Sequence, residues 1–311
     1  MASFLSRREW LGGALAATAA QSAPRPKGVL VDSHVHLFAD DQKRFPYHRN
    51  ATYKPPAQPV EAYIRFAKEA KLAHALIVHP EPYQDDHRYL EYCFEREHAA
   101  GFFKGTCLLD PLRPNTPDRM EALIKKLPGR IVAIRIHENL PAGKAPAAAG
   151  PIRDRDLDGP GMKETWRAAA TLGLAVQMHF IPRYAPQIAK LAAEFRSAPV
   201  ILDHLARAGQ GGPGEYDQVL RLAQFPQVIM KFSGIAHSSK QDHPYLDAKP
   251  LVRRAFHAFG ADRIIWGGLG MNMAEFEKAS ALLDLMFDFA QESDRVKIRG
   301  ANAMKLFSFR T

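Results

Sequence analysis

Two histidines two residues apart, His34 and His36, lie in an apolar, β-branched stretch near the start of the chain, residues 31–37. In a strand, side chains at positions i and i+2 point to the same face, so the two imidazoles would converge on one point. Converging ring nitrogens suit zinc or a similar divalent cation, and protonated imidazoles can hold an oxyanion. Two hydrogen-bonded histidines on an ordinary strand would carry the same short pattern. The remaining sequence decides between these interpretations.

Eight short apolar runs alternate with amphipathic stretches along the chain, and we expect a strand in each run. The runs cover residues 28–38, 74–79, 101–109, 131–137, 174–180, 200–204, 228–233 and 263–267. Continuous apolar runs are typical of parallel strands that are buried on both faces. Eight such units predict an α/β fold, a (β/α)8 TIM barrel, regular or distorted. An open doubly wound sheet is the alternative, but no glycine-rich phosphate motif follows the first run.

Polar residues gather at the ends of these expected strands. In a barrel the carboxyl ends of the strands carry the active site. A single histidine at such an end is commonly structural, whereas several on different strands predict a functional site. The strand-end residues are His34, His36, His79, Arg135, His137, His179, Asp203, His204, Lys231 and Ser233.

Composition narrows the classes of partner. The formal net charge is +9, yet the basic residues alternate with acidic ones and form no dense run. We therefore expect no nucleic-acid binding, and the excess positive charge favours a small anionic substrate. The two cysteines, Cys93 and Cys107, are too few for a disulfide framework and are expected to be buried.

The N-terminus has the features of an export signal. Arg7 and Arg8 precede a short, weakly apolar run rich in alanine and glycine over residues 12–20. This order predicts a twin-arginine signal over residues 1–23, which would use the twin-arginine export machinery and deliver the protein to the periplasm or outside the cell. The run is too short for stable membrane insertion. Residues 24–311 would form one barrel domain, with a long loop over 139–160 on the active-site face.

Several motifs resemble the amidohydrolase-related (amidohydrolase 2) family, in order and over essentially the whole mature chain. They are Asp32-x-His34-x-His36, Leu202-Asp203-His204, Lys231-Phe232-Ser233-Gly234, Ile265-Trp266-Gly267 and Asn302-Ala303-x-x-Leu306-Phe307. Phe45-Pro46-Tyr47 followed by Tyr53 looks most similar to the 2-pyrone-4,6-dicarboxylate lactonases. The resemblance implies a distorted-barrel hydrolase of a small, anionic lactone or cyclic ester.

The resemblance also implies roles for individual residues. His34 and His36 match a pair that binds a divalent metal such as zinc or manganese in some members and contacts substrate in metal-free members. His179 falls at the place of a third metal ligand, and His204 at that of a substrate-polarising or acid/base group. Arginine binds a carboxylate through two parallel hydrogen bonds, which makes arginines the best carboxylate holders. The expected substrate-binding residues are Tyr47, Arg135, Arg183, Arg207 and Lys231.

One position departs from the family pattern. After the eighth strand the family has Trp-Gly-Ser-Asp, whereas this chain has Trp266-Gly267-Gly268-Leu269. A leucine can neither accept a proton from water nor bind a cation.

Four interpretations of this departure stay open. His34, His36 and His179 could hold a metal with an open position for water. His204 could act as the base of a metal-free site. A nearby Asp203, Asn272 or Glu275 could substitute for the aspartate, although an asparagine is no base. The chain could also bind ligand without catalysis, as a periplasmic pseudoenzyme, and a metal-dependent decarboxylase is a further alternative within the family.

Overall fold

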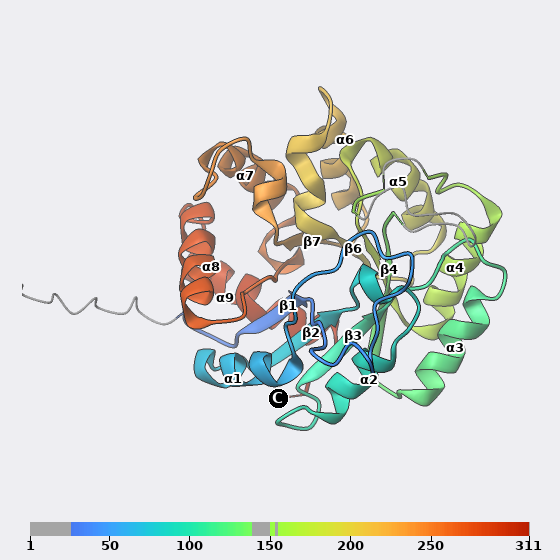
Figure 1. The fold of residues 1–311 in the computed structure, drawn as a ribbon. Helices are drawn as coiled ribbons and strands as arrows, with labels where there is room; N and C mark the ends of the chain where they lie inside the picture. Colours follow the sequence, from blue (N-terminus) through green and yellow to red (C-terminus); the bar gives the residue numbers. More distant parts are fainter. Residues whose placement is uncertain (1–25, 139–149, 153–154, 311) are drawn as a thin grey trace, which may run out of the picture.

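The computed structural model describes residues 26–138, 150–152 and 155–310, so the expected export signal over residues 1–23 lies outside the described residues. Eight parallel strands pair in chain order around a nearly closed barrel, which confirms the predicted TIM barrel (Figure 1). The strands are β1 (Val31–Val35), β2 (His74–Val78), β3 (Phe103–Cys107), β4 (Ile131–Ile136), β5 (Ala175–Met178), β6 (Val200–Leu202), β7 (Val228–Phe232) and β8 (Ile264–Trp266).

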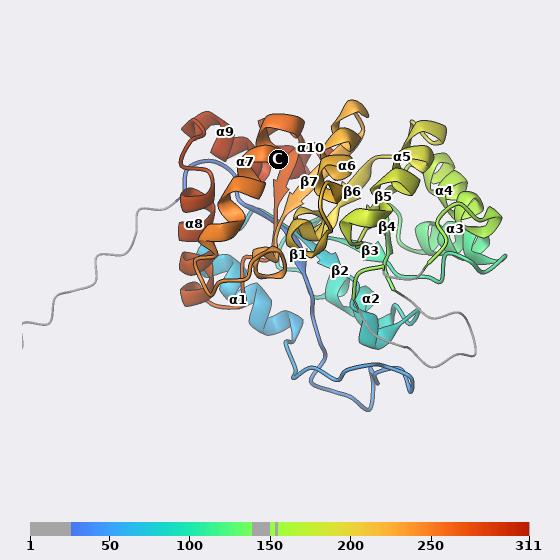
Figure 2. The same ribbon diagram turned by 90° about the horizontal axis from the view of Figure 1, so that it is seen from above.

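Helices ring the sheet, as the views in Figures 1 and 2 show together. Their apolar faces pack on the strands and their charged faces meet water, the pattern expected of surface helices. No helix in the described ranges is long and apolar enough to cross a membrane. The helices are α1 (Val60–Ala70), α2 (Arg88–Glu95), α3 (Thr116–Lys126), α4 (Pro160–Leu172), α5 (Ala185–Glu194), α6 (Glu215–Arg221), α7 (Lys249–Phe259), α8 (Met273–Met286), α9 (Glu292–Val296) and α10 (Asn302–Leu306).

The core has two parts. A large apolar cluster lies between the helices and the outer face of the sheet, and it includes the buried thiols of Cys93 and Cys107, as predicted. A smaller cluster joins one or two residues from each of several strands with Phe307 and Phe309 of the C-terminal segment. Its strand members are Val31, Leu76, Val78, Ala133, Ala175, Ile201 and Ile265.

The junction between β8 and β1, which we call the seam, is held in the described structure by side-chain hydrogen bonds and not by backbone pairing. Backbone ladders link β1 through β8 in sequence, and within the described residues no ladder links β8 back to β1. Side chains bridge this seam instead: Ser33 Oγ donates to the carbonyl of Trp266 at 2.5 Å, and Asp32 Oδ1 accepts from the amide of Gly268 at 2.9 Å. A Cβ at Gly267 would lie 2.6 Å from the His34 amide nitrogen, so this close approach requires glycine.

Candidate active site

Strand positions two apart stack in layers inside the barrel, because alternate side chains share a face. The lowest layer is apolar and belongs to the smaller core cluster. The middle layer is polar and ionic, and the top layer begins the site. On β4 and the residue after it, the three layers are Ala133, Arg135 and His137; the equivalent residues from β5 are Ala175, Gln177 and His179.

Most of the site residues follow the strands, whereas His34 lies within β1 and Arg135 within β4. The observed strands are shorter than the predicted runs, and all except β3, which is followed by Leu108, end one residue before a polar or glycine position. The backbone amides of these residues are not needed for pairing between strands, while the preceding strand fixes the positions of their side chains. The residues directly after the seven strands other than β3 are His36, His79, His137, His179, Asp203, Ser233 and Gly267.

Asp203 is the centre of the ionic layer. Its carboxylate is fully buried and accepts hydrogen bonds from Arg135 Nε at 3.0 Å and from Gln177 Nε2 at 2.9 Å. Lys231 Nζ, also fully buried, lies 3.3 Å away. Burial alone would raise the pKa of Asp203, but the charges of Lys231 and Arg135 hold it well below its usual range. Asp203 is therefore a carboxylate that neutralises two buried cations.

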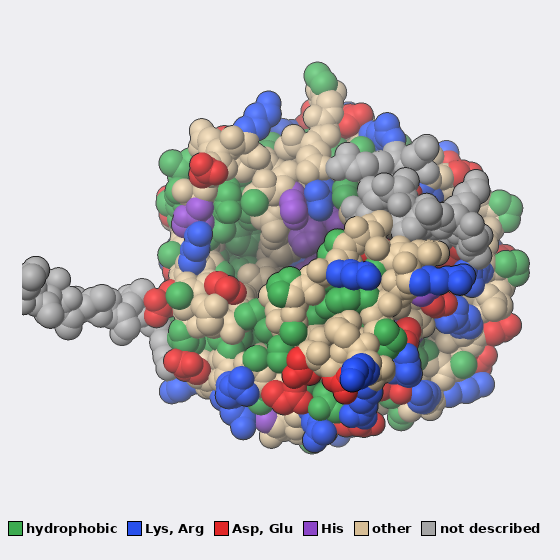
Figure 3. Space-filling view, viewed as in Figure 1, with side chains coloured by type: hydrophobic (Ala, Val, Ile, Leu, Met, Phe, Trp, Pro, Cys, Tyr) green, Lys and Arg blue, Asp and Glu red, His purple; other side chains and the backbone are tan. Residues whose placement is uncertain are grey.

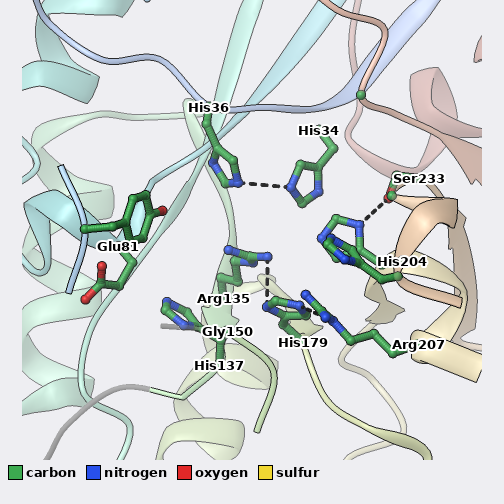
Figure 4. A pocket seen from close by; sticks show the side chains of 14 residues that line it. His34, His36, Glu81, Arg135, His137, Gly150, His179, His204, Arg207 and Ser233 are labelled. Atoms are coloured by element: carbon green, nitrogen blue, oxygen red, sulfur yellow. Dashed lines mark hydrogen bonds between the residues drawn. The ribbon is translucent and has the colours of Figure 1, made fainter. Parts of the chain in front are cut away.

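His34 and His36 converge as the sequence predicted. Their Nε2 atoms are 3.2 Å apart, and the two rings meet edge to face (Figure 4). The carbonyl of Val78 lies 2.7 Å from His36 Nδ1 and can only accept, so Nδ1 carries the hydrogen and Nε2 the lone pair. Burial lowers the pKa of His34 to about 4 and that of His36 well below its ordinary value, so both rings are neutral at neutral pH.

This neutral pair fits a divalent cation. His34 Nδ1 faces Asp203 Oδ1 at 3.7 Å. If the hydrogen of His34 is on Nδ1, the Nε2 lone pairs of His34 and His36 point at each other. If it is on Nε2, the Nδ1 lone pair of His34 faces the carboxylate of Asp203. Both arrangements are repulsive. A cation between the Nε2 atoms removes this conflict, and tetrahedral zinc with Zn–N bonds of about 2.0–2.1 Å separates two nitrogens by roughly 3.3 Å. A second set of possible ligand atoms, from His34, Asp203 and His204, lies within 4.8 Å of one another.

His179 lies on the cavity wall but does not fit the third-ligand role that the resemblance implied. Its Nδ1 is 3.3 Å from Arg135 Nη2, and its Nε2 accepts from Arg207 Nε at 3.0 Å. A guanidinium can only donate, so the imidazole lone pair is directed at an arginine. In this geometry His179 positions the two arginines and has no nitrogen left for a metal.

His204 and Arg207 reach the cavity through a left-handed turn within the short 3-10 segment Asp203–Gln210. The φ angles of the four residues His204 to Arg207 are 55°, 54°, 52° and 49°, although none is glycine. Such a conformation costs roughly 1–2 kcal/mol per residue, which the surrounding packing must offset. His204 Nδ1 lies 2.9 Å from Ser233 Oγ. A Cβ at Gly234 would come 2.7 Å from His204 Nδ1, so Gly234 makes room for the ring.

These groups surround one cavity of about 580 Å³ at the carboxyl ends of the strands. Figure 3 shows histidine and basic side chains at the bottom of a hollow in this face. The wall also contains residues for which the sequence carried no functional signal, notably Glu81 and His237. The lining residues are His34, His36, Tyr53, Glu81, Arg135, His137, Gly150, His179, His204, Arg207, Ser233, Gly234, His237 and Gly268.

Three expected substrate-binding residues, Tyr47, Arg183 and Lys231, lie away from the cavity wall. The Tyr47 hydroxyl donates to the carbonyl of Pro55 at 3.0 Å, and its ring packs on Phe38. Arg183 is exposed and its guanidinium lies over the ring of Tyr184. Lys231 lies one layer below the wall, paired with Asp203. The expected strand-end residue His79 is also absent from the wall, because it bonds the carbonyl of Gln84 at 3.0 Å.

Leu269 belongs to the core. Its side chain is fully buried, and its amide is directed at Asp32 Oδ2 at 3.4 Å. Asn272 and Glu275 do not replace the missing carboxylate: Asn272 Oδ1 caps helix α8 by accepting from the Glu275 amide, and Glu275 Oε2 accepts from the Met271 amide at 2.7 Å. The β8 end thus supplies backbone for the seam and no acid to the cavity.

The fold, the paired histidines and the strand-end layer define an amidohydrolase-type hydrolase. The amidohydrolase family model matches residues 31–309, and the chain belongs to this family. A 4-sulfomuconolactone hydrolase from Hydrogenophaga intermedia is 24% identical over 286 residues, 89% of this chain and 88% of the relative.

Solved structures share the fold. A Pseudomonas putida protein assigned as a 2-pyrone-4,6-dicarboxylic acid hydrolase has a TM-score of 0.71 at 19% identity, covering 91% of this chain and 98% of its own. A Burkholderia multivorans amidohydrolase solved with bound zinc has a TM-score of 0.68 at 14% identity, covering 91% of this chain and 100% of its own.

Replacing Asp203 tests the ionic layer. Asp203→Asn leaves Arg135 and Lys231 without a counter-charge, and we expect the free energy of unfolding to fall by about 3–5 kcal/mol. Asp158→Asn is the control, because Asp158 pairs with Lys190 at the surface, at 2.9 Å, where such a pair contributes about 1 kcal/mol or less. Urea unfolding of both variants measures the difference. Equal losses in the two variants would contradict the role given to Asp203.

Acid should destabilise the fold through its buried histidines. Burial lowers the pKa of His87 to about 4, below the ordinary value of 6.5. The unfolded chain therefore binds more protons than the folded one in this range, and the contribution of His87 to stability is complete above pH 6.5 and lost towards pH 4. Urea unfolding at stepped pH should show this decline. His87→Gln should make it less steep by about one proton, and an unchanged slope would refute the assignment.

Proposed function

We propose that this protein hydrolyses a small anionic lactone or cyclic ester. The supporting observation is that one cavity brings together a neutral histidine pair, a third histidine held by a serine, and two arginines. The lactone-hydrolysing relative supports the same reaction class. This combination supplies the three requirements of the reaction: a group to polarise the carbonyl, an acid/base, and a site for the anion.

Arg207 and Arg135 are the carboxylate site of this proposal. Both line the cavity from the same side, and both are held by His179. Anchoring in Asp203 and His179 fixes the guanidinium planes before substrate arrives, which lowers the entropy lost on binding. A carboxylate bound there would place the adjoining lactone ring toward the three histidines of the upper wall (Figure 4).

The reaction then needs one water and no other reactant. The water oxygen bonds to the lactone carbonyl carbon while one of its protons passes to His204 Nε2, and Ser233 holds Nδ1 of the same ring. The ring C–O bond breaks, and its oxygen takes the proton back from His204, giving a hydroxycarboxylic acid that ionises to the carboxylate at neutral pH. His34 and His36 lie beside His204, with 4.6 Å between the ring centroids of His34 and His204, where the carbonyl oxygen would lie.

A divalent cation is part of this proposal. Held by the Nε2 atoms of His34 and His36, it would supply Lewis-acid polarisation of the carbonyl. We expect near-stoichiometric zinc or manganese when the purified protein is analysed by elemental mass spectrometry. The double variant H34A/H36A should lose it, whereas His179→Ala should retain it because both His179 nitrogens contact arginines. Loss of the metal in His179→Ala would contradict this expectation and support a ligand set of His34, His36 and His179.

The anion site is tested by a matched pair of arginines. Arg207→Met should raise KM for a carboxylated lactone about 10- to 100-fold, the effect of losing a charge-assisted hydrogen bond of about 1.5–3 kcal/mol. Arg183→Met removes the same charge outside the cavity and should leave KM unchanged. Steady-state kinetics on a lactone panel, with and without added zinc or manganese, provides the measurement. Binding without turnover under every condition would favour a binding protein, and release of CO₂ would favour a decarboxylase.

A further inference from the structure

Glu81 is a carboxylate in a cavity whose other charged wall groups are cationic. It begins the 3-10 turn that follows β2 and is only 4% exposed. Among the residues described, it is the one carboxylate on the cavity wall, opposite Arg207 (Figure 4). Neither the catalytic proposal nor the family resemblance uses it.

The Glu81 carboxylate is held in place but lacks a cation. Gln84 Nε2 donates to Oε1 at 2.6 Å, and Thr52 Oγ1 donates to Oε2 at 3.2 Å. In the described part of the chain no lysine or arginine forms an ion pair with it. The backbone amide of Thr52 donates as well. A carboxylate accepts about four hydrogen bonds, so these three donors leave room for a further one. A buried carboxylate with unused acceptors is costly unless a donor reaches it.

The charges therefore divide the cavity into two ends. Arg135 and Arg207 form a cationic end beside His179, and Glu81 forms an acidic end beside the β1–α1 segment, which contributes the neutral Tyr53 to the wall. Tyr53 responds to both ends: burial and then the Glu81 charge raise its pKa to about 12, while Arg135 opposes that rise. A ligand that spans the cavity meets donors at one end and an acceptor at the other.

We infer that the cavity selects lactones carrying one carboxylate and, at the far side of the molecule, a hydroxyl group that donates to Glu81. The inference rests on the proposed function and specifies its substrate class. A second carboxylate in place of the hydroxyl would face Glu81 and be repelled. This chain would therefore disfavour dicarboxylates, and Glu81 is a specificity-determining residue for monocarboxylated, hydroxylated substrates.

Binding of two open-chain sugar acids tests this directly. D-gluconate and D-glucarate differ only at one end, which is a hydroxymethyl group in the first and a carboxylate in the second. Calorimetric titration of the full-length protein should give at least roughly tenfold tighter binding of gluconate, a difference of about 1.4 kcal/mol. Glu81→Gln should bring the two affinities within about twofold of each other, mainly by tightening glucarate. Glu81→Asp keeps the charge and should keep the preference.

The controls make every outcome decisive. Glu277→Gln removes an exposed acidic charge on helix α8 and should leave the affinity ratio as in the wild type. Circular dichroism shows whether each variant is folded. Equal or tighter glucarate binding by the wild type, a ratio unchanged in Glu81→Gln, or no binding of either acid would overturn the inference. A role of Glu81 as general base would instead lower kcat on all lactones alike, without changing the ratio.

These titrations need no turnover. If the protein discriminates between the two acids but hydrolyses no lactone, the proposed function is refuted and the role of Glu81 in ligand selection is supported. If it hydrolyses lactones without discriminating between the acids, the proposed function is supported and the role of Glu81 is refuted.

Discussion

The barrel interior depends on one buried carboxylate, that of Asp203. Taking charges out of water costs several kcal/mol per ion, and this cost is met only when opposite charges and hydrogen bonds surround them closely. Asp203 provides this for Arg135 and Lys231, and Gln177 fills its remaining acceptor positions. Asp203 also begins the turn that carries His204 and Arg207, and it faces His34. Charge balance and site geometry thus depend on the same group.

Much of this arrangement could be predicted from the sequence. Alternation of apolar runs with amphipathic stretches indicated eight strands, and the two-residue spacing of His34 and His36 indicated convergence, because both follow from local backbone periodicity. Depth along a strand was harder to predict. Lys231 and Ser233 are two residues apart on one face, but only Ser233 reaches the cavity, since Lys231 lies one layer lower.

Loop positions were not predictable in the same way. Tyr47 and Glu81 both follow strands in irregular segments, where no periodicity relates sequence to direction. An aromatic motif suggested Tyr47, yet its hydroxyl bonds Pro55; nothing in the sequence suggested Glu81, yet it lines the cavity. The position of Leu269 follows from the junction between β8 and β1. The amides of Gly268 and Leu269 are directed at the Asp32 carboxylate, which takes the place of a backbone ladder between these strands.

The left-handed turn has a consequence for how such a protein diversifies. Four successive residues with positive φ tolerate few replacements, because β-branched or bulky side chains clash in this region. We therefore expect few substitutions to be tolerated in the wall that carries His204 and Arg207. In the described residues of the opposite wall, which is built from the β1–α1 segment and the turn after β2, Gln84 is the one non-glycine residue with a positive φ angle. Mutational drift can thus alter the acidic wall and change the preferred ligand while the strained wall keeps the reaction constant.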